Sequence, residues 1–132
     1  MTRLLTLVVA MTVLTWLSIM VAAMLRSKSW TPSGMKLAMG NREDQPEPTP
    51  LAGRADRASK NTMETFILFA VLALAALAAA PHNAQVLLGA QIFFWARVVY
   101  LPIYYAGIQG VRTLVWATGV AGLALMVAGL CS

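Results

Sequence analysis

The chain has 132 residues, of which 59% are hydrophobic and only 11% are charged. A soluble domain usually has about a quarter charged residues. This composition excludes a disordered chain, a disulfide-rich scaffold and an ordinary soluble enzyme, and it indicates an integral membrane protein. The net charge of +5 could suggest nucleic acid, but no basic segment carries interleaved aromatic residues, so we expect no nucleic-acid partner.

Four apolar runs are long enough to cross a bilayer. At 1.5 Å per residue they would reach about 28 to 36 Å, against a hydrocarbon core of roughly 30 Å. The runs do not alternate in polarity as barrel strands do, so helices are expected. The predicted fold class is therefore an all-α integral membrane bundle of four transmembrane helices. The predicted spans are Leu4–Leu25, Thr62–Ala80, Ala84–Gly107 and Thr113–Cys131.

The first run has a second interpretation as a secretory signal. Arg3 supplies a charged start, and Ala22 and Ala23 are small enough for a cleavage site. The apolar stretch is longer than the usual signal core of about 7–15 residues. A retained first helix is the favoured interpretation.

The connections between the runs differ in length and charge. The short segments 81–83 and 106–112 predict that the last three helices are antiparallel neighbours. The long loop 26–53 contains Pro46, Pro48 and Pro50, which favour extended backbone over helix. Eleven of the fifteen charged residues lie between Arg26 and Lys60. The positive-inside rule then places this loop and the Arg112 loop in the cytoplasm, with both termini outside.

Five polar residues precede or enter the second run at spacings of three, three, one and three. At about 100° per residue they fall within an arc of roughly 120° on one helix face. A solvated helix end would explain the basic residues, but it explains Glu64 poorly, because an acid inside an apolar run needs a partner. This polar stripe consists of Arg54, Arg57, Lys60, Asn61 and Glu64.

Arg97 lies deep in the third run, where an isolated guanidinium costs at least about 2.5–3.5 kcal/mol. Because Glu64 is the only acid inside any apolar run, we predict a Glu64–Arg97 ion pair between the second and third helices. An alternative is that such a pair has a purely structural role and fixes the register of the two helices. Tyr100 and Tyr104 follow Arg97 on the same helix face, either as site residues or as ordinary interfacial tyrosines.

These residues form a pattern that resembles the MAPEG family, the membrane-associated proteins in eicosanoid and glutathione metabolism. The resemblance covers about residues 1–130 and implies one domain over the whole chain, a homotrimer, and glutathione bound as co-substrate between subunits near the cytoplasmic face. Pro102 and the segment 106–110 resemble bacterial members, which implies a bacterial inner membrane. The pattern is Arg57-x-x-Lys60-Asn61-x-x-Glu64, then Arg97-x-x-Tyr100-x-x-x-Tyr104, then Arg112.

The resemblance also assigns roles to residues. The arginine matching Arg112 would activate the glutathione thiol, because the thiolate is the nucleophile and a free cysteine thiol has a pKa near 8.5. Glutathione has two carboxylates and one ammonium, so guanidinium groups could bind the former and Glu64 the latter. Lys60 stands where better-known members have arginine, and a lysine cannot form the same bidentate fork. The implied glutathione-binding residues are Arg57, Lys60, Asn61, Glu64, Arg97, Tyr100 and Tyr104.

Two functions follow from this interpretation. The first is a glutathione S-transferase or peroxidase that acts on small lipophilic electrophiles from the bilayer, with Arg112 as catalytic residue and no metal. The second is a non-catalytic membrane protein in which the same residues serve a structural or partner-assembly role. A small transporter is disfavoured, because the sequence shows no inverted repeat and no broken helix.

Overall fold

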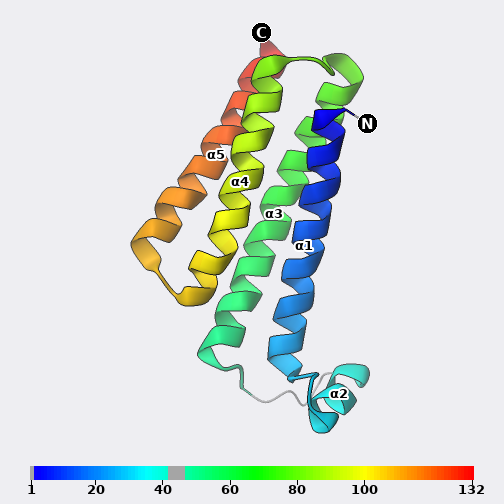
Figure 1. The fold of residues 1–132 in the computed structure, drawn as a ribbon, viewed down its shortest axis with the longest axis vertical. Coiled ribbons are helices and arrows are strands. Elements are labelled where there is room, and N and C mark those ends of the chain that lie inside the picture. Colours follow the sequence, from blue (N-terminus) through cyan, green and yellow to red (C-terminus); the bar gives the residue numbers. More distant parts are fainter. Residues whose placement is uncertain (1, 42–46) are drawn as a thin grey trace.

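The computed structural model describes residues 2–41 and 47–132, and its regular elements there are all helices. Four long helices run side by side, and a short helix lies beyond one end of the bundle (Figure 1). The N- and C-termini lie at the opposite end from this short helix (Figure 1). The elements are α1 (Arg3–Ser27), α2 (Pro32–Met39), α3 (Pro50–Ala79), α4 (Ala84–Ala106) and α5 (Gln109–Cys131).

The ends of these helices follow from local sequence. Thr31 and Thr49 cap α2 and α3, each accepting a hydrogen bond from a backbone N–H of the first turn. Asn83 caps α4 in the same way, through the N–H of Val86. Gly107 ends α4 with a φ of 78°, a left-handed conformation that costs glycine little.

The long loop differs from the sequence prediction. Pro50 is the first residue of α3 and not part of an extended segment, so this part of the prediction was wrong. A proline is tolerated there because the first four N–H groups of a helix have no intrahelical partner. The second span therefore starts well before Thr62, and α2 interrupts the predicted loop. Pro46 lies outside the described residues.

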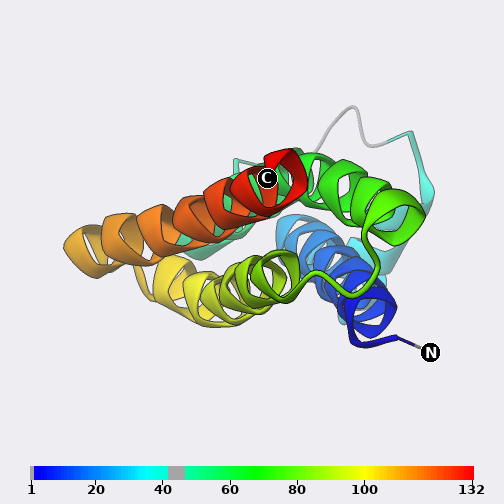
Figure 2. The same cartoon turned by 90° about the horizontal axis from the view of Figure 1, so that it is seen from above.

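α4 and α5 pack with their backbones in close approach. A Cβ atom on Gly89 would overlap the carbonyl oxygen of Gly122, and one on Gly122 would meet the Gly89 oxygen in turn. Small residues allow this approach between membrane helices. Figure 2, which looks along the bundle, shows α4 and α5 side by side and α1 lying next to α3 and α4.

The core of the bundle is small and apolar. The rings of Phe69 in α3 and Phe93 in α4 stack with centroids 4.9 Å apart, and Met11 of α1 and Met126 of α5 are fully buried beside them. Many large apolar side chains point outward instead, such as Leu114 with 70% exposure. All four long helices have the length and composition of membrane spans, so this is an integral membrane protein with an all-α four-helix fold.

Candidate functional site

Three arginines from α3 and α5 meet at the α2 end of the bundle. α4 ends at Ala106 and α5 begins at Gln109, so the first turns of α5 return to the end of the bundle where α3 starts. Arg54, Arg57 and Arg112 line one cavity of about 410 Å³, here called the arginine cavity. None of the described residues that line it is acidic. The other lining residues are Pro48, Thr49, Pro50, Gly53, Gly107 and Gln109.

Arg54 ties α3 to the turn between α4 and α5. Its Nε donates a hydrogen bond of 2.9 Å to the backbone carbonyl of Tyr105. Its side chain also passes close to Gly107, the residue that ends α4. The sequence explained Arg54 as part of a solvated helix end, but the structure gives it a specific contact that holds one wall of the arginine cavity in place.

A line of contacts leads from the arginine cavity into the bundle, from Arg112 through the two rings of Tyr104 and Tyr100 to Arg97. Arg97 is only 2% exposed, and its Cζ lies 4.3 Å from the centroid of the Tyr100 ring. The Tyr100 and Tyr104 rings meet edge to face at 5.5 Å, and the Cζ of Arg112 lies 4.5 Å from the Tyr104 centroid. Arg97, Tyr100 and Tyr104 therefore share one side of α4, as their spacing predicted, and Arg112 of α5 joins them.

The predicted ion pair between Glu64 and Arg97 is absent, so that prediction was wrong for the single chain. Glu64 is exposed, whereas Thr65 beside it in sequence is buried with Phe69. Adjacent residues on a helix point about 100° apart, so the face of α3 that carries Thr65 packs inward and Glu64 points away. Arg97 is stabilised by the Tyr100 and Phe93 rings instead, and its Nη1 has no hydrogen-bond partner among the described residues.

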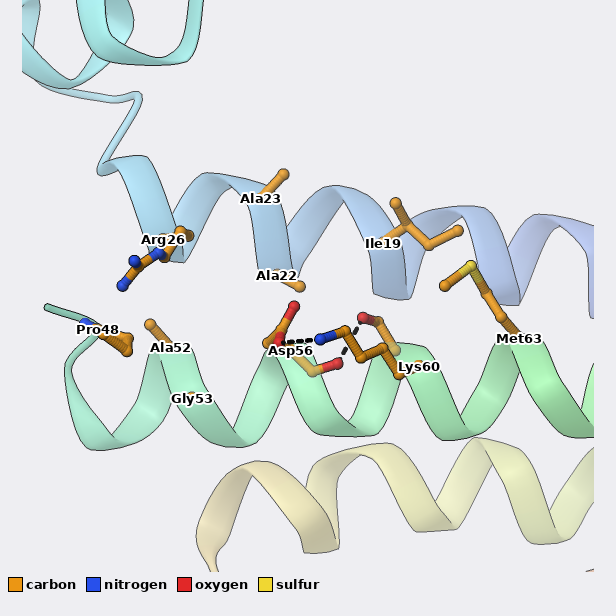
Figure 3. A pocket seen from close by; sticks show the side chains of 11 residues that line it. Ile19, Ala22, Ala23, Arg26, Pro48, Ala52, Gly53, Asp56, Lys60 and Met63 are labelled. Atoms are coloured by element: carbon orange, nitrogen blue, oxygen red, sulfur yellow. Dashed lines mark hydrogen bonds and ion pairs between the residues drawn. The ribbon is translucent and has the colours of Figure 1, made fainter. Parts of the chain in front are cut away.

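Lys60 lies at a different cavity from Arg57. It lines a space of about 460 Å³ between α1 and α3, together with Arg26, Asp56 and Met63 (Figure 3). Its Nζ is 3.1 Å from the Asp56 carboxylate, the one ion pair for which both partners are described residues. Asp56 was not among the predicted site residues, although its position four residues before Lys60 is the usual spacing for such a pair.

The remainder of the polar stripe follows the outer side of α3. Arg57 and Glu64 are exposed, and Asn61 between them is half-buried. The described residues offer no hydrogen-bond partner to the Asn61 side-chain oxygen, although solvent does not reach it. The single chain therefore brings Arg54, Arg57 and Arg112 together and stacks Arg112 on Tyr104, but it leaves Lys60 and Glu64 apart from them.

The sequence of the chain is similar to that of one known protein family. The sequence model of the MAPEG family matches residues 3–131. No curated protein and no solved structure matches the chain. Because the family match extends over nearly the full length, including all four long helices and the arginine cavity, the chain belongs to the MAPEG family.

Proposed function

We propose that this protein is a homotrimeric enzyme that binds glutathione as co-substrate and conjugates it through its thiol sulfur to small lipophilic electrophiles, or uses it to reduce lipophilic peroxides. The observation that carries this proposal is the arginine cavity, in which Arg54, Arg57 and Arg112 meet without an acidic residue among the described lining residues. Such a cavity favours a ligand with more than one anionic group.

The charges of glutathione suit this cavity. At neutral pH the tripeptide has two carboxylates and one ammonium, and a guanidinium binds a carboxylate through two parallel hydrogen bonds. Arg57 is exposed and free to turn toward such a group, whereas Arg54 already donates its Nε to the Tyr105 carbonyl. In this proposal Arg57 binds a carboxylate and Arg54 mainly keeps the cavity in shape.

Arg112 is the proposed catalytic residue. It lies in the first turn of α5, where the N-terminal end of the helix adds positive potential, and the Tyr104 ring limits the movement of its guanidinium. A cation beside the thiol favours the thiolate, and each tenfold gain in the thiolate ratio needs about 1.4 kcal/mol. The thiolate sulfur would then attack the electrophile.

The outer side of α3 supports the homotrimer. Glu64 is exposed on this side of its own bundle, and a carboxylate is costly against lipid. A second copy that covers this side would remove the cost and would complete a site between subunits. Glu64 would then receive the glutathione ammonium, and Arg97, Tyr100 and Tyr104 would support the opposite wall.

The orientation of the protein follows from its charge. We place the arginine cavity and the loop 26–53 on the cytoplasmic side of a bacterial inner membrane, with both termini outside. Arg54, Arg57 and Arg112 all lie at the end of the bundle that α2 marks, and basic residues favour the cytoplasmic side. Cytoplasmic glutathione would then reach the cavity, while the electrophile would arrive through the lipid.

Glutathione binding by the purified protein in detergent tests this proposal. We expect saturable binding by calorimetry and a rise in thiolate absorbance when glutathione is mixed with the protein. Arg112→Ala should abolish the absorbance and leave much of the binding, whereas Arg3→Ala at the far end of the bundle should change neither. Absence of binding at millimolar glutathione, with the oligomer intact, would contradict the proposal.

A non-catalytic role is the second candidate, and the packing of Arg97 favours it. The guanidinium lies between the Phe93 and Tyr100 rings, which is a structural contact that needs no ligand. In that case Arg97→Met should disrupt folding or assembly, and neither glutathione, its oxidised form nor other thiols should raise the melting temperature of the wild type. A thermal-shift panel separates the two candidates.

A further inference from the structure

α2 is held rigidly against the end of α1. The two helices are joined by a tight turn in which the backbone N–H and the hydroxyl of Thr31 both donate to the Lys28 carbonyl. A Cβ on Gly34 of α2 would overlap the same carbonyl oxygen, so the backbones touch. Because this contact leaves no room between them, the position of α2 follows from that of α1.

The length of α1 places this contact at the membrane surface. α1 has 25 residues and is about 37 Å long, while the hydrocarbon core is about 30 Å thick. Its apolar residues continue to Leu25, and the basic residues Arg26 and Lys28 follow at once. The end of α1 therefore lies in the headgroup region, and α2 lies there with it, beyond the end of the four long helices (Figure 1).

The exposed side chains around α2 have the chemistry of such a region. Met35 and Met39 are four residues apart on one side of the helix and are 48% and 80% exposed, and Trp30 just before the helix is 61% exposed. Lys28 and Lys36 are exposed beside them, and the sequence has no acidic residue from Arg26 to Asn41. Tryptophan and lysine at this depth are typical of membrane interfaces.

We propose that α2 and Trp30 form an interfacial anchor that binds the anionic lipid headgroups of the protein's own bilayer. Trp30, Met35 and Met39 enter the boundary between headgroups and acyl chains, and Lys28 and Lys36 contact lipid phosphates. The anchor fixes the depth of α2 and of the adjoining end of α1. It is independent of glutathione, because it rests only on the membrane-spanning α1 and the surface of α2.

Trp30 provides a probe of this anchor in the whole protein. The other three tryptophans, Trp16, Trp95 and Trp116, are replaced by phenylalanine, and the variant is reconstituted into vesicles of phosphatidylcholine alone or mixed with phosphatidylglycerol. Size-exclusion chromatography in detergent checks that its oligomeric state is that of the wild type. Quenching of Trp30 is then measured with aqueous acrylamide and with lipids brominated near the headgroup or near the chain end.

We expect lipid bromine near the headgroup to quench Trp30 at least about twofold more than bromine near the chain end, as suits a helix in the interface. Acrylamide should quench it weakly. Met35→Gln with Met39→Gln should weaken the lipid quenching, whereas Ser33→Gln, on the other side of α2, should not. Lys28→Gln with Lys36→Gln should remove the difference between anionic and neutral vesicles.

Three results would overturn the proposal. Strong acrylamide quenching without lipid quenching would place α2 in water. Protection from both quenchers would show that protein covers Trp30, either a neighbouring subunit or a partner. Equal quenching in anionic and neutral vesicles for the protein with both lysines would contradict the headgroup contacts.

Discussion

The guanidinium of Arg112 lies over the ring of Tyr104, with 4.5 Å between the Cζ atom and the ring centroid. The two residues come from different helices, so this contact joins the first turn of α5 to the last turns of α4. A cation over an aromatic face gains about 0.5–2 kcal/mol, depending on how far water is excluded. Tyr104 is therefore a positioning residue for Arg112.

Replacement of the Tyr104 ring should weaken thiolate formation more than loss of its hydroxyl. Tyr104→Leu removes the ring that orients Arg112, and we expect a fall in the thiolate signal with glutathione of about 2- to 30-fold, which corresponds to the cation–π energy. Tyr104→Phe keeps the ring and should retain most of the signal. Stopped-flow absorbance measures both variants, and a leucine variant equal to the wild type would show that the stacking has no role.

Arg54 should matter for stability more than Arg57 does. Arg54→Met removes the hydrogen bond to the Tyr105 carbonyl and should lower the free energy of unfolding by about 1.5–3 kcal/mol, the range for a hydrogen bond to a charged group. Arg57→Met is the matched control, because Arg57 is exposed and should change stability little while weakening glutathione binding. Thermal unfolding in detergent compares them, and equal melting temperatures would contradict a structural role for Arg54.

The close approach of α4 and α5 predicts an effect of added methyl groups. Gly122→Ala places a Cβ against the Gly89 carbonyl and should destabilise the protein by about 1–3 kcal/mol or more, the cost of overpacking a tight contact. Gly110→Ala is the control, since its Cβ would meet nothing within 4 Å, and alanine should stabilise the helix by up to about 1 kcal/mol. Opposite shifts in melting temperature are expected, and a stable Gly122→Ala variant would contradict the packing.

The sequence predicted features that depend on one helix and failed where two helices must be aligned. One side of α4 carries Arg97, Tyr100 and Tyr104, because residues three or four apart lie on the same face of a helix. To predict the Glu64–Arg97 pair, one must also know how α3 is turned about its own axis, and the sequence of α3 alone does not give this. Both Glu64 and Thr65 are polar, and the packing of Phe69 against Phe93 decides which of them faces the core.

α2 and the start of α3 were missed for a different reason. The prolines of the long loop were interpreted as breakers of helix, although a threonine followed by proline is also a usual way to begin one. The pairs Thr31-Pro32 and Thr49-Pro50 both serve that purpose. The arginine cavity could not be predicted from the sequence either, because it depends on the turn at Gly107 bringing Arg112 back toward α3.

Lys60 should contribute less to glutathione binding than Arg57, although both belong to the polar stripe. Lys60 is paired with Asp56 at 3.1 Å and lines the cavity on the α1 side, whereas Arg57 lines the arginine cavity. Arg57→Gln should weaken glutathione binding by about tenfold or more, the cost of losing a charge-assisted contact. Lys60→Gln should change it by less than about threefold, as is typical for an exposed pair.

Asp56→Asn separates the two explanations for a weak Lys60 effect. One explanation is that the ion pair with Asp56 keeps Lys60 from binding glutathione. Asp56→Asn should then tighten glutathione binding, and Lys60→Gln in the Asp56→Asn background should weaken that binding. If Lys60 faces a different cavity, as the structure shows, both changes should leave affinity nearly unaltered. Calorimetry on the four proteins of this cycle measures the coupling, and a large effect of Lys60→Gln in either background would place Lys60 at the glutathione.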